Sequence, residues 1–220
     1  MTYTNKENSN VKVTCIKTGI MDNNTWLIKN THSGEGFIVD ASFHPGEIIE
    51  RIKADNTDLK GILLTHSHYD HIMSVNEIKE EFKVPVYAGL DEKELLEDDR
   101  LNLSYKAGRT NIEISADNYV NDGDEINLCG LTINAIYTPG HTKGGICWYI
   151  PEENLLFSGD TLFYRTHGRT DLPTGDSAAI RDSLLNKLFK LPPETKVFPG
   201  HGEITDIGQE KKHNVIYVSV

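Results

Sequence analysis

The stretch Thr65-His66-Ser67-His68-Tyr69-Asp70-His71 brings three imidazoles and one carboxylate together directly after the apolar run at residues 61–64. Imidazole nitrogens and carboxylate oxygens are the ligands that divalent zinc, iron and manganese accept. One histidine at such a place is easily explained as a structural residue. Four ligand-type residues in this order at the end of an apolar strand instead indicate a metal site.

Composition narrows the class of protein. The 220 residues suit one domain with a sizeable core, which we expect at residues 11–220 after a flexible lead-in at residues 1–10. Acidic residues outnumber basic ones by 33 to 22, giving a formal net charge of −11. A protein that neutralises phosphates normally has a basic surface, so we expect no nucleic-acid partner.

The chain shows no sign of a membrane segment or a disulfide framework. No apolar run approaches the roughly 20 residues that cross a bilayer, and residues 1–10 lack the apolar centre of a secretory signal. The cysteines Cys15, Cys129 and Cys147 are far apart and odd in number, as expected for small core residues in a reducing compartment. We therefore expect a cytoplasmic protein with no membrane partner.

Periodicity predicts strands and hairpins, then strand-helix units, then hairpins again. Helices are predicted to begin at Pro45 and after the cap residue Asp176 or Ser177, and to cover residues 72–82 and 91–98. Turns are predicted at residues 22–24 and 33–34, and a loop at residues 101–111. This order suits two mixed sheets packed together with helices outside. The strands are expected at residues 11–17, 25–29, 36–40, 59–64, 84–88, 125–137 (a hairpin), 146–150, 154–157 and 196–198.

Three more ligand-type residues follow predicted strands in glycine-containing turns. They are His141 after Pro139-Gly140, Asp160 after Ser158-Gly159, and His201 after Pro199-Gly200. Any one of them alone would be a turn or cap residue. Strand ends that meet at one edge of a sheet bring distant side chains together, and glycine lets backbones approach closely. Repeated three times, the pattern makes these residues candidates to complete the site.

This set of residues resembles the metallo-β-lactamase fold hydrolases, whose pattern is H-x-H-x-D-H followed by a distant His, Asp and His. The resemblance implies an α/β (α+β) fold, a four-layer αββα sandwich of two mixed sheets flanked by helices. It also implies one metal held by His66, His68 and His141, and a second by Asp70, His71 and His201, with Asp160 bridging both. Asp40 matches the family's aspartate that orients a ligand histidine; a surface turn residue is the alternative.

The implied cofactor is a pair of divalent ions, with zinc as the first expectation and iron or manganese as alternatives. Such a pair can share a hydroxide that attacks an electrophilic carbonyl while a metal stabilises the oxyanion. Asp70 would act as a ligand that also orients the hydroxide or accepts its proton. A non-catalytic metal scaffold would not require all seven ligands.

The segments at residues 138–142, 158–163 and 168–173 resemble glyoxalase II and its shorter relatives without the C-terminal helical domain. The resemblance implies thioester hydrolysis, with an anionic small molecule of the S-lactoylglutathione kind as substrate. Aspartate at position 160 separates the chain from β-lactamases that have a cysteine ligand there. The glutathione contacts of full-length glyoxalase II after the bridging aspartate do not appear, so the thiol carrier stays open.

The sequence leaves the substrate contacts, the branch of the family and the oligomeric state open. Arg165 and Arg169 could bind a substrate carboxylate, or Arg169 could pair with Asp171 to hold the loop. Tyr105 and Tyr164 could line the cleft or pack in the core. The alternative function is a persulfide dioxygenase with a single iron on the equivalents of His66, His141 and Asp160, a branch that shares the Gly-Arg-Thr-Asp motif at residues 168–171. The oligomeric state is not specified by the sequence.

Overall fold

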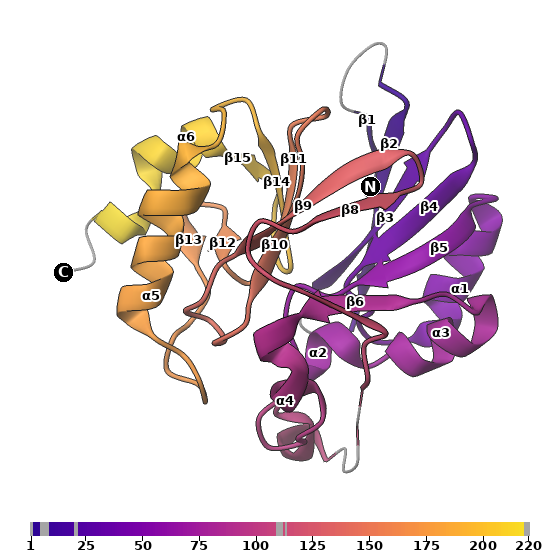
Figure 1. Cartoon of the computed structure of the whole chain (residues 1–220), viewed down its shortest axis with the longest axis horizontal. Coiled ribbons are helices and arrows are strands. Elements are labelled where there is room, and N and C mark those ends of the chain that lie inside the picture. Colours follow the sequence, from indigo (N-terminus) through magenta and orange to yellow (C-terminus); the bar gives the residue numbers. More distant parts are fainter. Residues whose placement is uncertain (1, 5–8, 20–21, 109–111, 113, 218–220) are drawn as a thin grey trace.

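The computed structural model describes residues 2–4, 9–19, 22–108, 112 and 114–217. Two β-sheets face each other in the middle of the molecule, and helices cover the outer face of each (Figure 1). Helices α1 (Pro45–Ala54) and α3 (Val75–Phe82) cover one sheet, and α5 (Ser177–Asp182) and α6 (Ile207–His213) cover the other. This confirms the four-layer αββα sandwich expected from the sequence.

The first sheet is mixed and has seven strands in chain order. Its edge strand is formed by part of the segment that was expected to be a flexible lead-in; residues 1 and 5–8 lie outside the described residues. The third strand starts at Asn23, so the turn predicted at residues 22–24 is wrong for Asn23 and Asn24, which are buried strand residues. The strands are β1 (Thr2–Thr4), β2 (Val11–Thr18), β3 (Asn23–Asn30), β4 (Glu35–Val39), β5 (Asp58–Leu63), β6 (Val86–Gly89) and β7 (Asn118–Val120).

The second sheet is also mixed, in the order β15-β14-β11-β10-β9-β8. Both predicted hairpins are present, and the first turns at Cys129 and Gly130, which have φ angles of 54° and 72°. A short antiparallel pair of strands, β12 (Leu162–Phe163) and β13 (Thr166–His167), follows β11 in the sequence. The six strands are β8 (Glu125–Leu128), β9 (Leu131–Tyr137), β10 (Ile146–Ile150), β11 (Leu155–Gly159), β14 (Lys196–Pro199) and β15 (Thr205–Asp206).

Three of the predicted segments between the strands need correction. The helical period at residues 72–82 is divided between α2 (Tyr69–Ile72) and α3, and the predicted loop at residues 101–111 contains a 3₁₀ helix, η2 (Ser104–Ala107). Residues 109–111 lie outside the described residues. The acidic helix at 91–98 is a 3₁₀ turn, η1 (Leu90–Glu92), followed by α4 (Lys93–Leu96). Asp176 caps α5 as predicted, accepting hydrogen bonds from the backbone of Ala178 and Ala179.

Aromatic side chains between the sheets fix the strand ends. Trp148 is fully buried and its Nε1 donates to the carbonyl of Leu64 at 3.1 Å, just before the histidine cluster. Trp26 Nε1 donates to the carbonyl of Pro199 at 2.9 Å, two residues before His201. Buried tryptophans need a partner for the indole N–H, and here the partners are the ends of β5 and β14. The core therefore determines where the ligand-bearing turns begin.

In the part of the chain that the structure describes, no helix has the length and apolar character needed to span a membrane.

Candidate metal centre

The predicted ligands come from the ends of four strands that meet at one edge of the sandwich. The histidine cluster follows β5, His141 follows β9, Asp160 follows β11 and His201 follows β14. The two sheets are joined directly at this edge, since the backbone of Ile146 donates to the carbonyl of Thr65 at 2.8 Å. Distant parts of the sequence thus converge as the repeated strand-end pattern predicted.

The first group consists of His66, His68 and His141, each with a potential ligand atom within 4.8 Å of the others. All three are buried, and His68 Nδ1 lies 2.9 Å from His141 Nε2. His141 Nδ1 is 2.8 Å from the carbonyl of Arg169, so Nδ1 bears the proton and donates it there. This hydrogen bond leaves Nε2 of His141 with its lone pair toward the group, as a metal ligand requires.

The second group consists of Asp70, His71 and His201. His201 Nε2 lies 3.3 Å from His71 Nε2 and 3.3 Å from Asp70 Oδ2. Asn23 donates from Nδ2 to Asp70 Oδ2 at 2.9 Å and to its backbone carbonyl at 3.1 Å. The sequence analysis missed Asn23 because asparagine at a strand start is usually read as a turn residue.

Asp160 lies between the two groups. Its Oδ2 is 3.6 Å from His141 Nε2 and 3.5 Å from His201 Nε2, and its Oδ1 is 3.4 Å from His71 Nε2. The backbone passes so close here that a Cβ on Gly200 would lie 2.3 Å from Asp160 Oδ1. Glycine at this position is therefore a steric requirement of the site.

Asp40 is buried behind the second group, at 1% exposure, and is not a surface turn residue. His71 Nδ1 lies 2.8 Å from Asp40 Oδ2, an arrangement that directs His71 Nε2 toward the group. Asp40 also accepts hydrogen bonds from the backbone and hydroxyl of Thr65, and that hydroxyl lies 3.1 Å from His66 Nδ1. With both oxygens engaged in this way, Asp40 orients histidines rather than offering a ligand atom.

The histidines of the two groups differ in the direction in which their pKa values are shifted. Burial, followed by the neighbouring imidazoles, lowers the pKa of His68 to about 3 and that of His66 well below its usual range. Burial also disfavours charge on His71, but the carboxylates of Asp160, Asp70 and Asp40 raise its pKa well above the usual value. Neutral imidazoles thus stand beside a region where three carboxylates attract positive charge.

These residues fit a divalent metal. Nε2 of His66 and of His68 and Oδ1 of Asp160 are buried with no hydrogen-bond partner among the described residues. Buried polar atoms are normally paired, and an unpaired cluster of nitrogen and oxygen lone pairs calls for a cation. The donor set of imidazoles and carboxylates is the one that zinc, iron and manganese accept.

A cleft of about 420 Å³ opens onto both groups. Its rim holds two cations, Lys106 from η2 and Arg169, and its wall has the apolar side chains Leu103 and Leu172. The predicted contact Arg165 does not line this cleft; its side chain is exposed and its guanidinium lies 5.1 Å from the ring of Tyr164. Sequence reasoning missed Lys106 because a lysine without a surrounding motif looks like any solvated charge.

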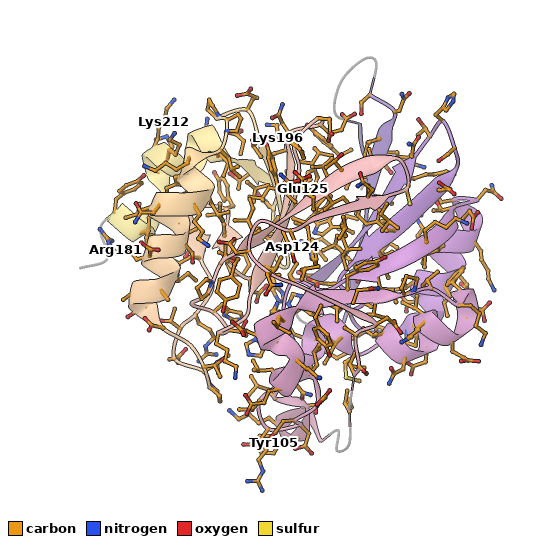
Figure 2. All side chains as sticks on the ribbon, in the orientation of Figure 1. Tyr105, Asp124, Glu125, Arg181, Lys196 and Lys212 are labelled. Carbon is orange, nitrogen blue, oxygen red and sulfur yellow. The ribbon has the colours of Figure 1, made fainter. Side chains whose placement is uncertain are left out.

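Neither interpretation of the two tyrosines is correct. Tyr164 is 43% exposed and Tyr105 is 45% exposed, and neither lines the cleft or the core. Figure 2 shows Tyr105 at the outer margin of the molecule, beyond α4 and far from the sheets. Aromatic side chains were assigned to the interior because most are buried, whereas Tyr105 is an exposed residue of η2 and Tyr164 lies in an exposed turn.

Comparison with known proteins identifies the class. A model of the metallo-beta-lactamase superfamily matches residues 18–201, and this chain belongs to that superfamily. It is 36% identical over 177 residues to "Probable metallo-hydrolase YqgX" of Bacillus subtilis (strain 168), covering 78% of this chain and 84% of that protein. It is 33% identical over 179 residues to "Hydroxyacylglutathione hydrolase GloC" of Haemophilus influenzae (strain ATCC 51907 / DSM 11121 / KW20 / Rd), covering 80% of this chain and 84% of that protein.

Solved structures agree on the fold. BLEG-1, described as a B3 metallo-beta-lactamase, has a TM-score of 0.89 and 35% identity, covering 94% of this chain and all of that one. TTHA1623 in a di-iron-bound form has a TM-score of 0.82 and 31% identity, covering 92% and 98%. ETHE1 from Myxococcus xanthus has a TM-score of 0.75 and 26% identity, covering 92% and 82%. The comparisons therefore establish the superfamily and leave the substrate open.

Proposed function

We propose that this chain is a binuclear metal-dependent hydrolase that cleaves an anionic thioester of the hydroxyacylglutathione kind. The observation that supports this most is the pair of buried ligand groups, joined by Asp160, that opens onto a cleft with a cation at its rim. The hydroxyacylglutathione hydrolase of Haemophilus influenzae, at 33% identity, supports the thioester class.

In this proposal His66, His68 and His141 hold one metal, Asp70, His71 and His201 hold the other, and Asp160 contacts both. When bound, such a pair lowers the pKa of water toward about 7 and polarises a carbonyl oxygen. Zinc is our first assignment, and iron is the alternative that the di-iron form of TTHA1623 supports.

Asp70 is the protein group suited to orient an attacking water beside the scissile bond. It lines the cleft, and Asn23 fixes its Oδ2 by a hydrogen bond of 2.9 Å. Burial would raise the pKa of Asp70, but His71, His201 and Asn23 hold it well below its usual value. The group is therefore an oriented carboxylate, which can accept a proton from an attacking water.

Lys106 is the group we assign to the substrate's carboxylate. It makes no ion pair with any described residue, whereas Arg169 is held by Asp171 at 2.7 and 2.8 Å. Leu103 and Leu172 add apolar surface to the same cleft. A substrate with a carboxylate at one end and an acyl thioester at the other matches this distribution.

The test measures metal per chain together with turnover of S-lactoylglutathione, followed by release of the glutathione thiol. We expect about two metals per chain and thioester cleavage that is lost on chelation and restored by metal. Thioester turnover no higher than that of the chelated sample would contradict the proposal.

The same preparation distinguishes two other candidates. Likeness to ETHE1 and the motif at residues 168–171 favour a persulfide dioxygenase, which would consume oxygen with glutathione persulfide and need one iron. Against it, Gly202 follows His201 where that branch usually has an Asp-Tyr pair. Likeness to BLEG-1 favours β-lactam hydrolysis, which a chromogenic cephalosporin would report.

A further inference from the structure

A buried carboxylate outside the ligand set connects the loops of the first group. Glu92 ends the 3₁₀ turn η1 and is only 1% exposed. Its Oε2 accepts the backbone N–H of Ser67 at 2.8 Å. Its Oε1 accepts the hydroxyl of Thr142 at 2.5 Å and the backbone N–H of Gly144 at 3.1 Å. The side chain therefore has three donors from two different loops.

These donors lie beside all three histidines of the first group. Ser67 stands between His66 and His68, and Thr142 directly follows His141. The backbone bond from Ile146 to Thr65 joins the two segments at the sheet edge, and Glu92 adds the contacts at Ser67 and Thr142, next to the histidines themselves. A shift of this carboxylate would move His68 relative to His141.

The backbone around Glu92 is packed to bring the side chain to this place. A Cβ on Gly144 would lie 2.5 Å from the backbone nitrogen of Glu92, and a Cβ on Gly89 would lie 2.6 Å from the carbonyl oxygen of Gly144. Both glycines are needed for this close approach. Tyr137 covers this contact from outside, with its hydroxyl oxygen 2.5 Å from both Asp91 Oδ2 and the carbonyl oxygen of Lys143.

Glu92 has no cationic partner among the described residues. Burial raises its pKa, and the hydrogen bonds from Ser67, Thr142 and Gly144 oppose that shift. A buried carboxylate without a counter-charge is a costly way to stabilise a fold. Its arrangement is better explained by what it holds in place.

We propose that Glu92 is a positioning residue that sets the metal affinity of the His66, His68 and His141 group without affecting the other group. The second group is held by different residues, Asp40 behind His71 and Asn23 beside Asp70, and Glu92 contacts neither. The inference rests on the proposed metal centre and deepens it, because it assigns the first group a support that the second group does not share.

Glu92→Gln is the sharpest variant. Glutamine keeps the size of the side chain, and its carbonyl oxygen can still accept from Thr142 and Gly144. Its amide nitrogen would then face the N–H of Ser67, a donor against a donor. Cobalt(II) titrated into metal-free protein, followed by its visible absorption, should fill two equivalents in the wild type. In Glu92→Gln we expect one equivalent to weaken about 10- to 100-fold and the other to stay unchanged.

A buried glutamate elsewhere gives a matched control. Glu210 is 0% exposed and accepts hydrogen bonds from Arg165, Thr205 and Asn214, away from the first group. Glu210→Gln should lower the melting temperature and leave the first-group equivalent unchanged. Thr142→Val removes one donor and keeps the fold; it should weaken the same equivalent as Glu92→Gln, to a smaller extent. In metal-free protein, the Ser67 amide resonance should move upfield in Glu92→Gln, because its N–H loses a charged acceptor.

Three outcomes would overturn the role of Glu92: identical titrations of Glu92→Gln and wild type, equal weakening of both equivalents, or the same loss in Glu210→Gln. Wild type that binds no cobalt would overturn the metal centre and the role of Glu92 together. Wild type that binds two equivalents but cleaves no thioester would remove only the substrate assignment.

Discussion

The ligand groups and the rim of the cleft share one cavity but are built in different ways. Four ligand histidines, His66, His68, His71 and His141, are only 1–6% exposed. Neighbouring polar groups contact the Nδ1 atoms of His66, His71 and His141 and orient their rings. At the rim, Lys106 and Arg169 are exposed side chains, and the ion pair of Arg169 lies in solvent. The packed core therefore holds the ligand groups in place. The side chains proposed to contact the substrate, Lys106 and Arg169, are not constrained by the core.

The largest effect is expected where the two ligand groups meet. Asp160→Asn keeps the shape of the side chain but removes the negative charge that faces His71, His141 and His201. We expect thioester turnover to fall by more than about a hundredfold and metal content to drop, since effects at this position should exceed those of residues behind the ligands. Steady-state thioester turnover and the metal content per chain of Asp160→Asn, compared with wild type, measure this effect. Asp171→Asn at the rim is the control and should retain both metals.

An intermediate effect is expected at the rim itself. Lys106→Ala should raise KM for a carboxylate-bearing thioester about three- to tenfold and leave kcat unchanged, because an exposed charge contributes modestly. A neutral thioester should show no change, and Lys106→Arg should restore the KM. The melting temperature should stay at the wild-type value, because the side chain packs against nothing in the core. Equal losses for charged and neutral substrates would show that Lys106 only shapes the loop.

This difference also explains what could be predicted from the sequence. The ligands follow apolar strands, and the hydrophobic pattern predicts where those strands end in the sequence. The repeated strand-end pattern and the resemblance to the family then indicated that these ends meet. The partners that align them are less visible. Asn23 lies in a sequence that is typical of a turn, and Glu92 lies in an acidic segment that resembles a solvent-exposed helix. Only tertiary packing buries them, so no local pattern could reveal their role.

The rim was the least predictable part for a related reason. Arg165 and Arg169 are close in the sequence, yet the backbone turns at Arg165, whose φ is 60°, and only Arg169 reaches the cleft. The backbone N–H of Arg165 is held by both oxygens of Glu210 at 3.0 Å. A sequence pattern gives the charge of a loop but not the direction of each side chain in it.

The smallest effects are expected at these two arginines. Arg165→Ala should leave KM, kcat and melting temperature unchanged, because its side chain does not line the cleft and contacts only the exposed ring of Tyr164. Arg169→Ala should raise KM by about twofold, since Asp171 already neutralises the guanidinium in solvent. Asp171→Asn should lower KM by releasing that charge toward the substrate. Steady-state kinetics with the charged and the neutral thioester measure all three. If Arg165→Ala weakened the charged substrate as much as Lys106→Ala, the rim would be organised by the net charge of the loop rather than by the single ammonium facing the cleft.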